Sequence, residues 1–249
     1  MAPALDRWWG VRSGVRAVAP AWSPADLTDL AGWWKADAGA PTVDSDPVSS
    51  WQDQSGNGYH LTQATGSKQP IIKLNIINGL PVIRLDGVDD ELVTALDVIA
   101  AGNQPHSLIV IGAYRTGAAD GSRIASLGTN STGEESCIGR LAPGPKAFYD
   151  GWGGGSQGSG TVAADTFYHF TKTYSSGEIN GWLNGTADKV AQAFTYNFSA
   201  TQRKLNVGSV NGFSAFAAVD VAEVILTHAA LTAGERTSLW DYIATRFAL

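Results

Sequence analysis

The chain of 249 residues has one cysteine, Cys137, one methionine and few charged side chains. A single cysteine forms no intrachain disulfide and no thiolate metal cluster, so we expect Cys137 to be a small buried side chain. The sequence lacks an apolar run of the roughly 18 residues that a membrane-spanning helix needs, so we expect no membrane insertion. It also lacks the apolar segment of a secretory signal peptide, so we expect no export by that route.

Basic residues are in deficit. There are 17 Lys and Arg against 23 Asp and Glu, which gives a formal net charge of −6 at pH 7. Proteins that bind nucleic acid gain affinity mainly by neutralising phosphates, so this balance argues against nucleic acid as a partner. It argues equally against anionic lipid. A neutral polar ligand such as a carbohydrate, or another protein, is compatible with the charge.

Turn-forming and aromatic residues are plentiful instead, with 29 Gly, 10 Pro and 9 Trp. Residues 167–174 alternate between two faces, and Asn184-Gly185 is a strong hairpin signal. Many short segments of this kind, separated by turns, predict an all-β sandwich rather than alternating strands and helices. The expected strands after residue 100 are 107–114, 123–127, 137–141, 147–150, 167–174, 179–183, 204–207 and 219–227.

Two helices are expected at the ends of this sandwich. Ser23 can cap, and Pro24 suits the first position of a short helix that ends before Gly32. Thr232 and Glu235 form a capping box that begins a C-terminal helix. The apolar residues of that helix share one face, which we expect to dock on the sandwich: Leu239, Tyr242, Ile243 and Phe247.

Residues 1–21 differ in composition from the rest of the chain. We interpret them as an arm that packs on another subunit or protein, followed by a single domain over residues 22–249. The alternatives are that these residues form a terminus without fixed structure or the first strand of the domain. The residues expected to anchor the arm are Arg7, Trp8, Trp9, Arg12 and Arg16.

Three segments, residues 22–37, 48–87 and 221–249, carry a family resemblance. They contain Leu30-Ala31-Gly32-Trp33-Trp34, then Trp51-Gln52-Asp53-Gln54-Ser55-Gly56-Asn57-Gly58, and finally Val221-Ala222-Glu223-Val224-Ile225-Leu226. In this order and spacing the chain resembles the laminin-G-like, concanavalin A-like lectin/glucanase jelly-roll family. The resemblance implies a concanavalin A-like jelly-roll sandwich and a non-catalytic binding or structural module. Such domains occur in bacterial surface proteins and in bacteriophage tail and head proteins.

The glutamates do not reproduce the motif of the family's enzymes, Glu-x-Asp-x-x-Glu. None of the six Glu begins it. Glu134 and Glu135 are adjacent, so on a strand they would point to opposite faces. We expect Glu223, alone in an apolar strand, to be a structural carboxylate that accepts hydrogen bonds from the backbone or from Trp or Arg. The sequence therefore predicts a protein that is not an enzyme.

Loop aromatics and nearby polar side chains are candidates for carbohydrate binding. Sugars stack on aromatic faces and bond to amides and carboxylates. The alternative for any one aromatic is packing in the core or against another subunit, and we assign Trp33, Trp34 and Trp51 to the core. The candidate carbohydrate-binding residues are Asn57, Tyr59, Tyr149, Asp150, Trp152, Trp182, Asn211 and Phe213.

Four aspartates in turn-rich segments are candidates for a calcium site: Asp53, Asp86, Asp89 and Asp90. Calcium takes six to eight oxygen ligands, which loop carboxylates and carbonyls supply. The alternative is that these residues form turns by bonding to their own backbone. No cofactor is expected to be required, and Ca²⁺ is the one candidate.

These observations lead to one preferred functional hypothesis and two alternatives. The preferred hypothesis is a non-enzymatic bacteriophage structural protein on the virion surface, at the tail or capsid exterior, made in the host cytoplasm. Its lectin-like domain would adhere to host-surface glycans, its arm would bind other virion proteins, and it would form a homo-oligomer. One alternative is a capsid or tail decoration protein that binds no sugar. The other is a polysaccharide-degrading enzyme with unfamiliar carboxylates.

Overall fold

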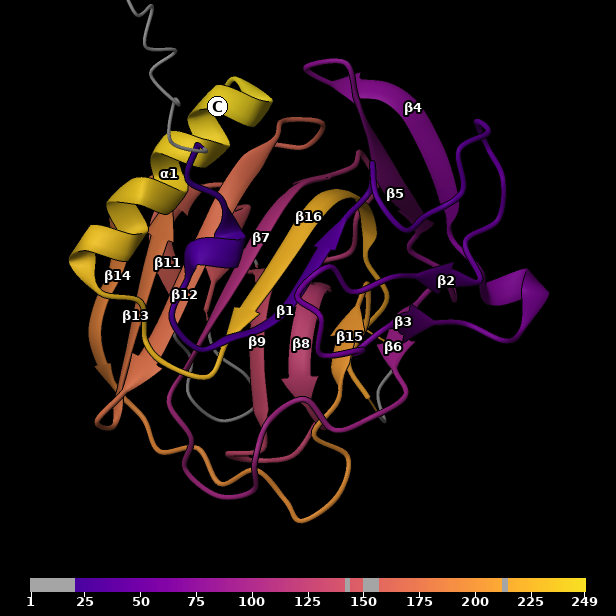
Figure 1. Cartoon of the computed structure of the whole chain (residues 1–249). Coiled ribbons are helices and arrows are strands. Elements are labelled where there is room, and N and C mark those ends of the chain that lie inside the picture. The colour runs from indigo at the N-terminus through magenta and orange to yellow at the C-terminus, as the bar shows by residue number, and fades with distance from the viewer. Residues whose placement is uncertain (1–20, 142–143, 150–156, 212–214) are drawn as a thin grey trace, which may run out of the picture.

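A computed structural model describes residues 21–141, 144–149, 157–211 and 215–249. They form two antiparallel β-sheets of eight strands each, packed face to face (Figure 1). The first sheet runs in the order β14 (Thr186–Ala193), β13 (Glu178–Leu183), β12 (Tyr168–Ser175), β7 (His106–Tyr114), β16 (Ala218–Thr227), β5 (Leu80–Asp86) and β4 (Ile71–Ile77). Strand β1 (Leu30–Lys35) also belongs to this sheet and pairs with the second half of β16.

The second sheet is made of shorter strands. In spatial order they are β11 (Gln157–Thr161), β10 (Lys146–Phe148), β9 (Glu135–Leu141), β8 (Arg123–Gly128), β15 (Leu205–Val207), β6 (Leu92–Thr94), β3 (Leu61–Thr62) and β2 (Ser50–Trp51). The predicted all-β sandwich is therefore confirmed at the level of two packed sheets.

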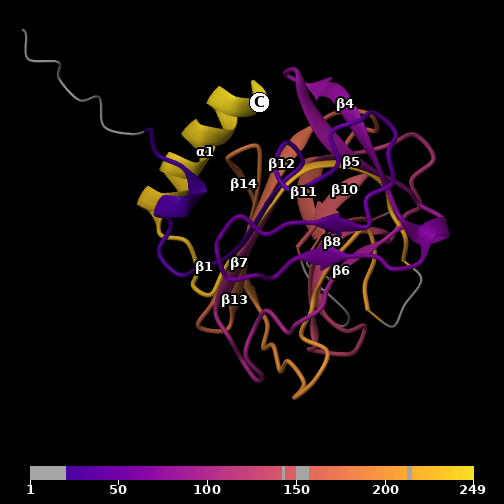
Figure 2. The same ribbon diagram turned by 45° about the vertical axis from the view of Figure 1, so that its right-hand side comes forward.

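The long helix α1 (Ala233–Phe247) forms a third layer on the outer face of the first sheet (Figure 2). Its capping box is present as predicted, since the Thr232 hydroxyl accepts from the Glu235 amide and the Glu235 carboxylate accepts from the Thr232 amide. Leu239, Ile243 and Phe247 face the sheet. Tyr242 is only half-buried and lies at the flank of that face.

The layer of α1 explains why the central strands lack an exposed face. All nine residues of β7 and all ten of β16 are buried, because one face meets the second sheet and the other meets the helix. Trp33 and Trp34 show the same division on β1. Successive strand side chains point to opposite faces, so Trp34 enters the core between the sheets and Trp33 packs beneath α1.

The N-terminal part differs from expectation. Where a short helix was predicted after Ser23, the structure has a single 3₁₀ turn, Pro24–Asp26, and a second such turn at Gly66–Lys68. Asp29, with φ of 57°, is in the left-handed region, and the chain then enters β1 at Leu30. The arm residues Arg7, Trp8, Trp9, Arg12 and Arg16 lie outside the described residues. No helix in the described ranges is long and apolar enough to cross a membrane.

Candidate functional site

A groove of about 730 Å³ lies between α1, the segment before the first 3₁₀ turn and the β4–β5 hairpin. Ligand-binding clefts usually measure about 300–1,000 Å³ and combine apolar walls with a few polar groups. This groove has that composition, with two aromatic rings, two aliphatic side chains and several polar groups. Its lining residues are Ala21, Trp22, Ser23, Asn78, Leu80, Ser238, Asp241, Tyr242, Thr245 and Arg246.

Helical spacing brings one wall of the groove together. Ser238, Asp241, Tyr242 and Thr245 stand at i, i+3, i+4 and i+7, which places them on one flank of α1. The Trp22 ring meets Tyr242 edge to face, with ring centroids 6.2 Å apart. The groove therefore has an aromatic corner beside an exposed carboxylate, Asp241.

The opposite wall depends on the Asn78-Gly79 turn. Both residues have positive φ, 46° and 76°, as the tight two-residue hairpin between β4 and β5 requires. The Asn78 amide then donates to the carbonyl of Arg246 over 2.9 Å, which ties the hairpin to the last turn of α1.

A buried carboxyl group lies behind the groove. Glu223 on β16 is completely buried and accepts from Trp33 Nε1 at 2.6 Å. It also accepts from Arg246 Nε at 3.1 Å and from the Tyr242 hydroxyl at 3.1 and 3.2 Å. Glu223 is thus the structural carboxylate, bonded to Trp and Arg, that the sequence predicted.

Burial dominates the charge state of this group. It raises the pKa of Glu223 to about 7, although the hydrogen bond from Trp33 and the charge of Arg246 act in the opposite direction. Burial and the adjacent carboxylate also raise the pKa of Tyr242, so its hydroxyl keeps its proton. Arg246 is shared with a second carboxylate, because its Nη2 lies 2.5 Å from Asp37 Oδ1.

Glu134 and Glu135, the adjacent glutamates of the sequence, do not line the groove. Glu135 on β9 is fully buried and forms an ion pair with Arg123 Nε of β8 at 2.8 Å. Glu134 precedes it in the turn that enters β9. Cys137 is fully buried as predicted, and burial raises the pKa of its thiol.

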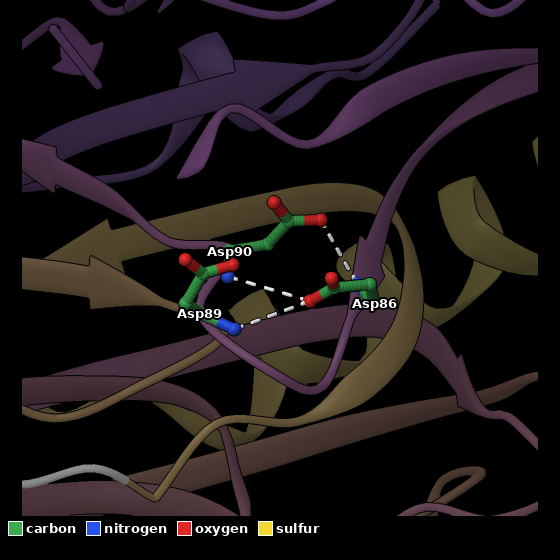
Figure 3. Close-up of side chains that lie close together, drawn as sticks. All are labelled: Asp86, Asp89 and Asp90. Atoms are coloured by element: carbon green, nitrogen blue, oxygen red, sulfur yellow. Dashed lines mark hydrogen bonds between the residues drawn. The ribbon is translucent and has the colours of Figure 1, made fainter. Parts of the chain in front are cut away.

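Three of the four predicted calcium ligands lie together. Asp86, Asp89 and Asp90 each place a carboxylate oxygen within 4.8 Å of the others (Figure 3). Burial first, and then the charges of Asp86 and Asp89, raise the pKa of Asp90 to about 6. A hard cation such as Ca²⁺ suits oxygen ligands of this kind, and its binding here stays a prediction.

The same aspartates also build their own turn. Asp86 Oδ1 accepts from the amides of Val88, Asp89 and Asp90 at 2.8 to 3.4 Å, and Asp90 Oδ2 accepts from the Asp86 amide at 3.0 Å. These bonds are dashed in Figure 3 where they join the residues drawn. Asp86 therefore stabilises this turn by accepting hydrogen bonds from its backbone, as the turn-forming alternative predicted.

Replacing Asp86 with Ala is expected to lower the free energy of unfolding by about 1–3 kcal/mol, because several amides lose their acceptor. Urea unfolding in a chelator measures this value without a contribution from metal. The matched control is Asp46→Ala, because the Asp46 carboxylate bonds to no other residue in the described part of the chain, and it should change stability little. Equal effects for the two variants would contradict the structural role of Asp86.

Asp53 is separate from this cluster. Its Oδ1 accepts from the amides of Trp33 and Ser55, and its Oδ2 accepts from the Ser55 hydroxyl and the Tyr59 amide. Asn57 donates to the carbonyls of Leu30 and Ala31, both at 3.0 Å. These contacts fasten the 53–60 loop to the start of β1. The half-buried Tyr59 ring packs against the core between the sheets.

The remaining carbohydrate candidates are dispersed. Tyr149 is fully buried, and its hydroxyl donates to Asp188 at 2.9 Å. Trp182 on β13 lies under Arg236, whose guanidinium is 4.4 Å from the ring centroid. The Asn211 carbonyl accepts from the Thr129 hydroxyl at 3.1 Å. Asp150, Trp152 and Phe213 lie outside the described residues.

The groove was not found from the sequence. Trp22, Asn78, Asp241 and Arg246 were not candidates, and Tyr242 was assigned to the face of α1 that packs on the sheet. The signals present were the Asn78-Gly79 turn and the polar flank of the helix. No pattern in the sequence predicts that the Asn78-Gly79 turn contacts α1.

No family model and no curated protein matches the sequence, whereas several solved structures share the fold. Domain 4 of AbnA, a GH43 extracellular arabinanase from Geobacillus stearothermophilus in complex with arabinotriose, matches with a TM-score of 0.61 and 12% identity. That match covers 84% of this chain and 97% of that chain.

Two further solved structures show the same likeness. Trypanosoma rangeli sialidase matches with a TM-score of 0.59 and 13% identity over 89% of this chain and 34% of that chain. An arabinofuranosidase complexed with arabinofuranosyl-α-1,2-xylobiose matches with a TM-score of 0.60 and 16% identity over 81% of this chain and 51% of that chain. The chain thus spans about a third of the length of the sialidase and about half of the length of the arabinofuranosidase. At these identities the likeness shows a shared β-sandwich fold.

These comparisons correct the functional hypothesis. A non-enzymatic bacteriophage virion protein was predicted, but these three solved structures with the same fold are domain 4 of an arabinanase, a sialidase and an arabinofuranosidase. They favour the polysaccharide-degrading alternative, and the prediction that the protein is not an enzyme is wrong on the same evidence. The virion and tail assignments have no support among them.

Proposed function

We propose that this protein acts in polysaccharide degradation and that it holds a polysaccharide chain in the groove beside α1. The observation that carries the proposal is the lining of the groove, in which the Trp22 and Tyr242 rings stand beside Asn78, Asp241 and Arg246. Aromatic faces stack on the apolar faces of sugar rings, while amide, carboxylate and guanidinium groups bond to hydroxyls. The formal charge of −6 favours a neutral polysaccharide.

The shared fold supports the same proposal. Domain 4 of the arabinanase carries arabinotriose, and almost its whole length matches this chain. We take arabinan-type oligosaccharides as the first ligands to test for that reason. We also propose that the sandwich is a laminin-G-like, concanavalin A-like jelly roll, on the three segments of sequence that resemble that family.

Replacing Asp241 with Ala is expected to weaken polysaccharide binding about fivefold, because a sugar hydroxyl loses a charged acceptor worth about 1 kcal/mol. Asp241 is exposed, so the fold should be unaffected. The measurement is isothermal titration with arabinotriose and linear arabinan, extended to xylan and sialylated glycans. Thr237→Ala, also exposed on α1 but outside the groove, is the matched control. Equal affinities for all three proteins would contradict the groove as the site.

The degradative step is tested on the same panel of polysaccharides by release of reducing ends. Glycoside hydrolysis generally uses two carboxyl groups. Asp241 is the carboxyl group that lines the groove, so it is the first to replace, whereas Glu223 is buried behind Tyr242 and Arg246 and does not reach the groove. Release that is lost in Asp241→Asn would place hydrolysis in the groove. If the protein neither binds nor cleaves any polysaccharide on the panel, that result would contradict the proposed function.

A further inference from the structure

The contacts of Glu223 suggest that it controls the groove without lining it. Its carboxyl group receives hydrogen bonds from three side chains on two different elements. Trp33 comes from β1, and Tyr242 and Arg246 come from α1. Tyr242 and Arg246 both line the groove, so the buried group fixes the positions of two lining side chains.

Only one of these three contacts can reverse its direction. The indole N–H of Trp33 and the guanidinium of Arg246 donate and cannot accept, whereas the hydroxyl of Tyr242 can do both. When Glu223 is ionised, Tyr242 must donate to it, and the lone pairs of the hydroxyl are left for the groove. When Glu223 carries a proton, it can donate to Tyr242, and the hydroxyl proton becomes free to point into the groove.

We propose that Glu223 is a positioning residue that sets the Tyr242 hydroxyl and the Arg246 guanidinium, so that the hydrogen-bonding pattern of the groove changes with pH near neutrality. This inference rests on the proposed function for its effect on ligand binding. Its structural part concerns the protein without ligand and can be tested separately.

The surroundings of Glu223 place the transition in an accessible range. Burial raises its pKa to about 7, so the group changes charge between pH 6 and pH 8. Four charged or titratable groups surround Glu223. Lys35 stands opposite it in the register of β1 and β16, Tyr242 and Arg246 come from α1, and Asp37 lies on the far side of Arg246. The β7 neighbour, Ile111, carries no charge.

The first test needs no ligand. The Trp33 indole proton lies on a 2.6 Å bond to Glu223, so its NMR shift should follow the charge of the carboxyl group. Wild type should show a transition near pH 7 in the Trp33 indole and the Tyr242 ring, and Glu223→Gln should show neither. Asp37→Asn, which removes the other carboxylate on Arg246, should keep both. Absence of the transition from wild type would overturn the inference.

The second test measures arabinan binding as a function of pH. At pH 8 the full carboxylate holds Tyr242 and Arg246 by charge-assisted bonds, so wild type should bind about three- to tenfold more tightly than at pH 6. Tyr242→Phe keeps the ring and removes the reversible hydroxyl, so the Trp33 indole shift should still follow the charge of Glu223 while the affinity varies less with pH. A pH profile in Glu223→Gln equal to that of wild type would overturn the inference. Failure of every protein to bind at any pH would instead count against the proposed function.

Discussion

Replacing Glu135 with Ala is expected to lower the free energy of unfolding by about 3–5 kcal/mol, because it leaves the Arg123 guanidinium buried without its carboxylate. The two side chains lie on neighbouring strands β8 and β9, 2.8 Å apart, with 9% of the Arg123 side chain and none of the Glu135 side chain exposed. Few charged residues are available in this chain, so a pair placed inside it is an unusual use of them.

Chemical denaturation of wild type and three variants measures the effect. The double variant Arg123→Met/Glu135→Leu should recover most of the lost stability, since apolar side chains of similar volume replace buried ion pairs at little cost. The control is Asp120→Ala, which removes the exposed partner of Arg140 at 3.7 Å and should change stability little. A cost for Glu135→Ala no larger than that of the control would contradict the account of this pair.

Replacing Trp22 with Ala is expected to weaken polysaccharide binding by about five- to 150-fold, which corresponds to the roughly 1–3 kcal/mol of one stacked aromatic ring. Trp22 is half-buried and forms the corner of the groove with Tyr242. Trp22→Phe keeps a smaller ring and should lose less affinity.

Isothermal titration with the oligosaccharide that binds most tightly to wild type measures this loss. Val88→Ala, which shortens a 71% exposed apolar side chain outside the groove, is the control and should bind as wild type does. Circular dichroism of each variant confirms that the sandwich is intact. Undiminished affinity in Trp22→Ala would place the sugar elsewhere on the molecule.

Local patterns predicted the layers of the fold well. The expected strands 107–114 and 219–227 became β7 and β16, because continuous apolar runs of that length bounded by turns suit strands buried on both faces. The capping box placed the start of α1 correctly, since Thr232 and Glu235 bond to each other's backbone within one turn of chain. Ser23 and Pro24 are equally good helix signals, yet the chain makes only a 3₁₀ turn there before it joins β1.

The candidate site was much less accessible to sequence reasoning. Asp86, Asp89 and Asp90 were found together because they lie within five consecutive residues of one turn. Asp53 does not join this cluster, because its carboxylate accepts hydrogen bonds from its own loop and from the start of β1. The groove joins residues near positions 22, 78 and 242, and only tertiary packing brings these segments to one place.

The most direct test of the central claim is a titration of ¹⁵N-labelled protein with arabinotriose and then with the wider panel of oligosaccharides, followed by NMR. We expect saturable shifts of the Trp22 indole and of backbone amides at Asp241, Tyr242 and Thr245, with Trp182 and Asn57 unaffected. Saturable shifts confined to other loops would contradict the groove as the polysaccharide site. No shift with any oligosaccharide would contradict polysaccharide recognition by this chain.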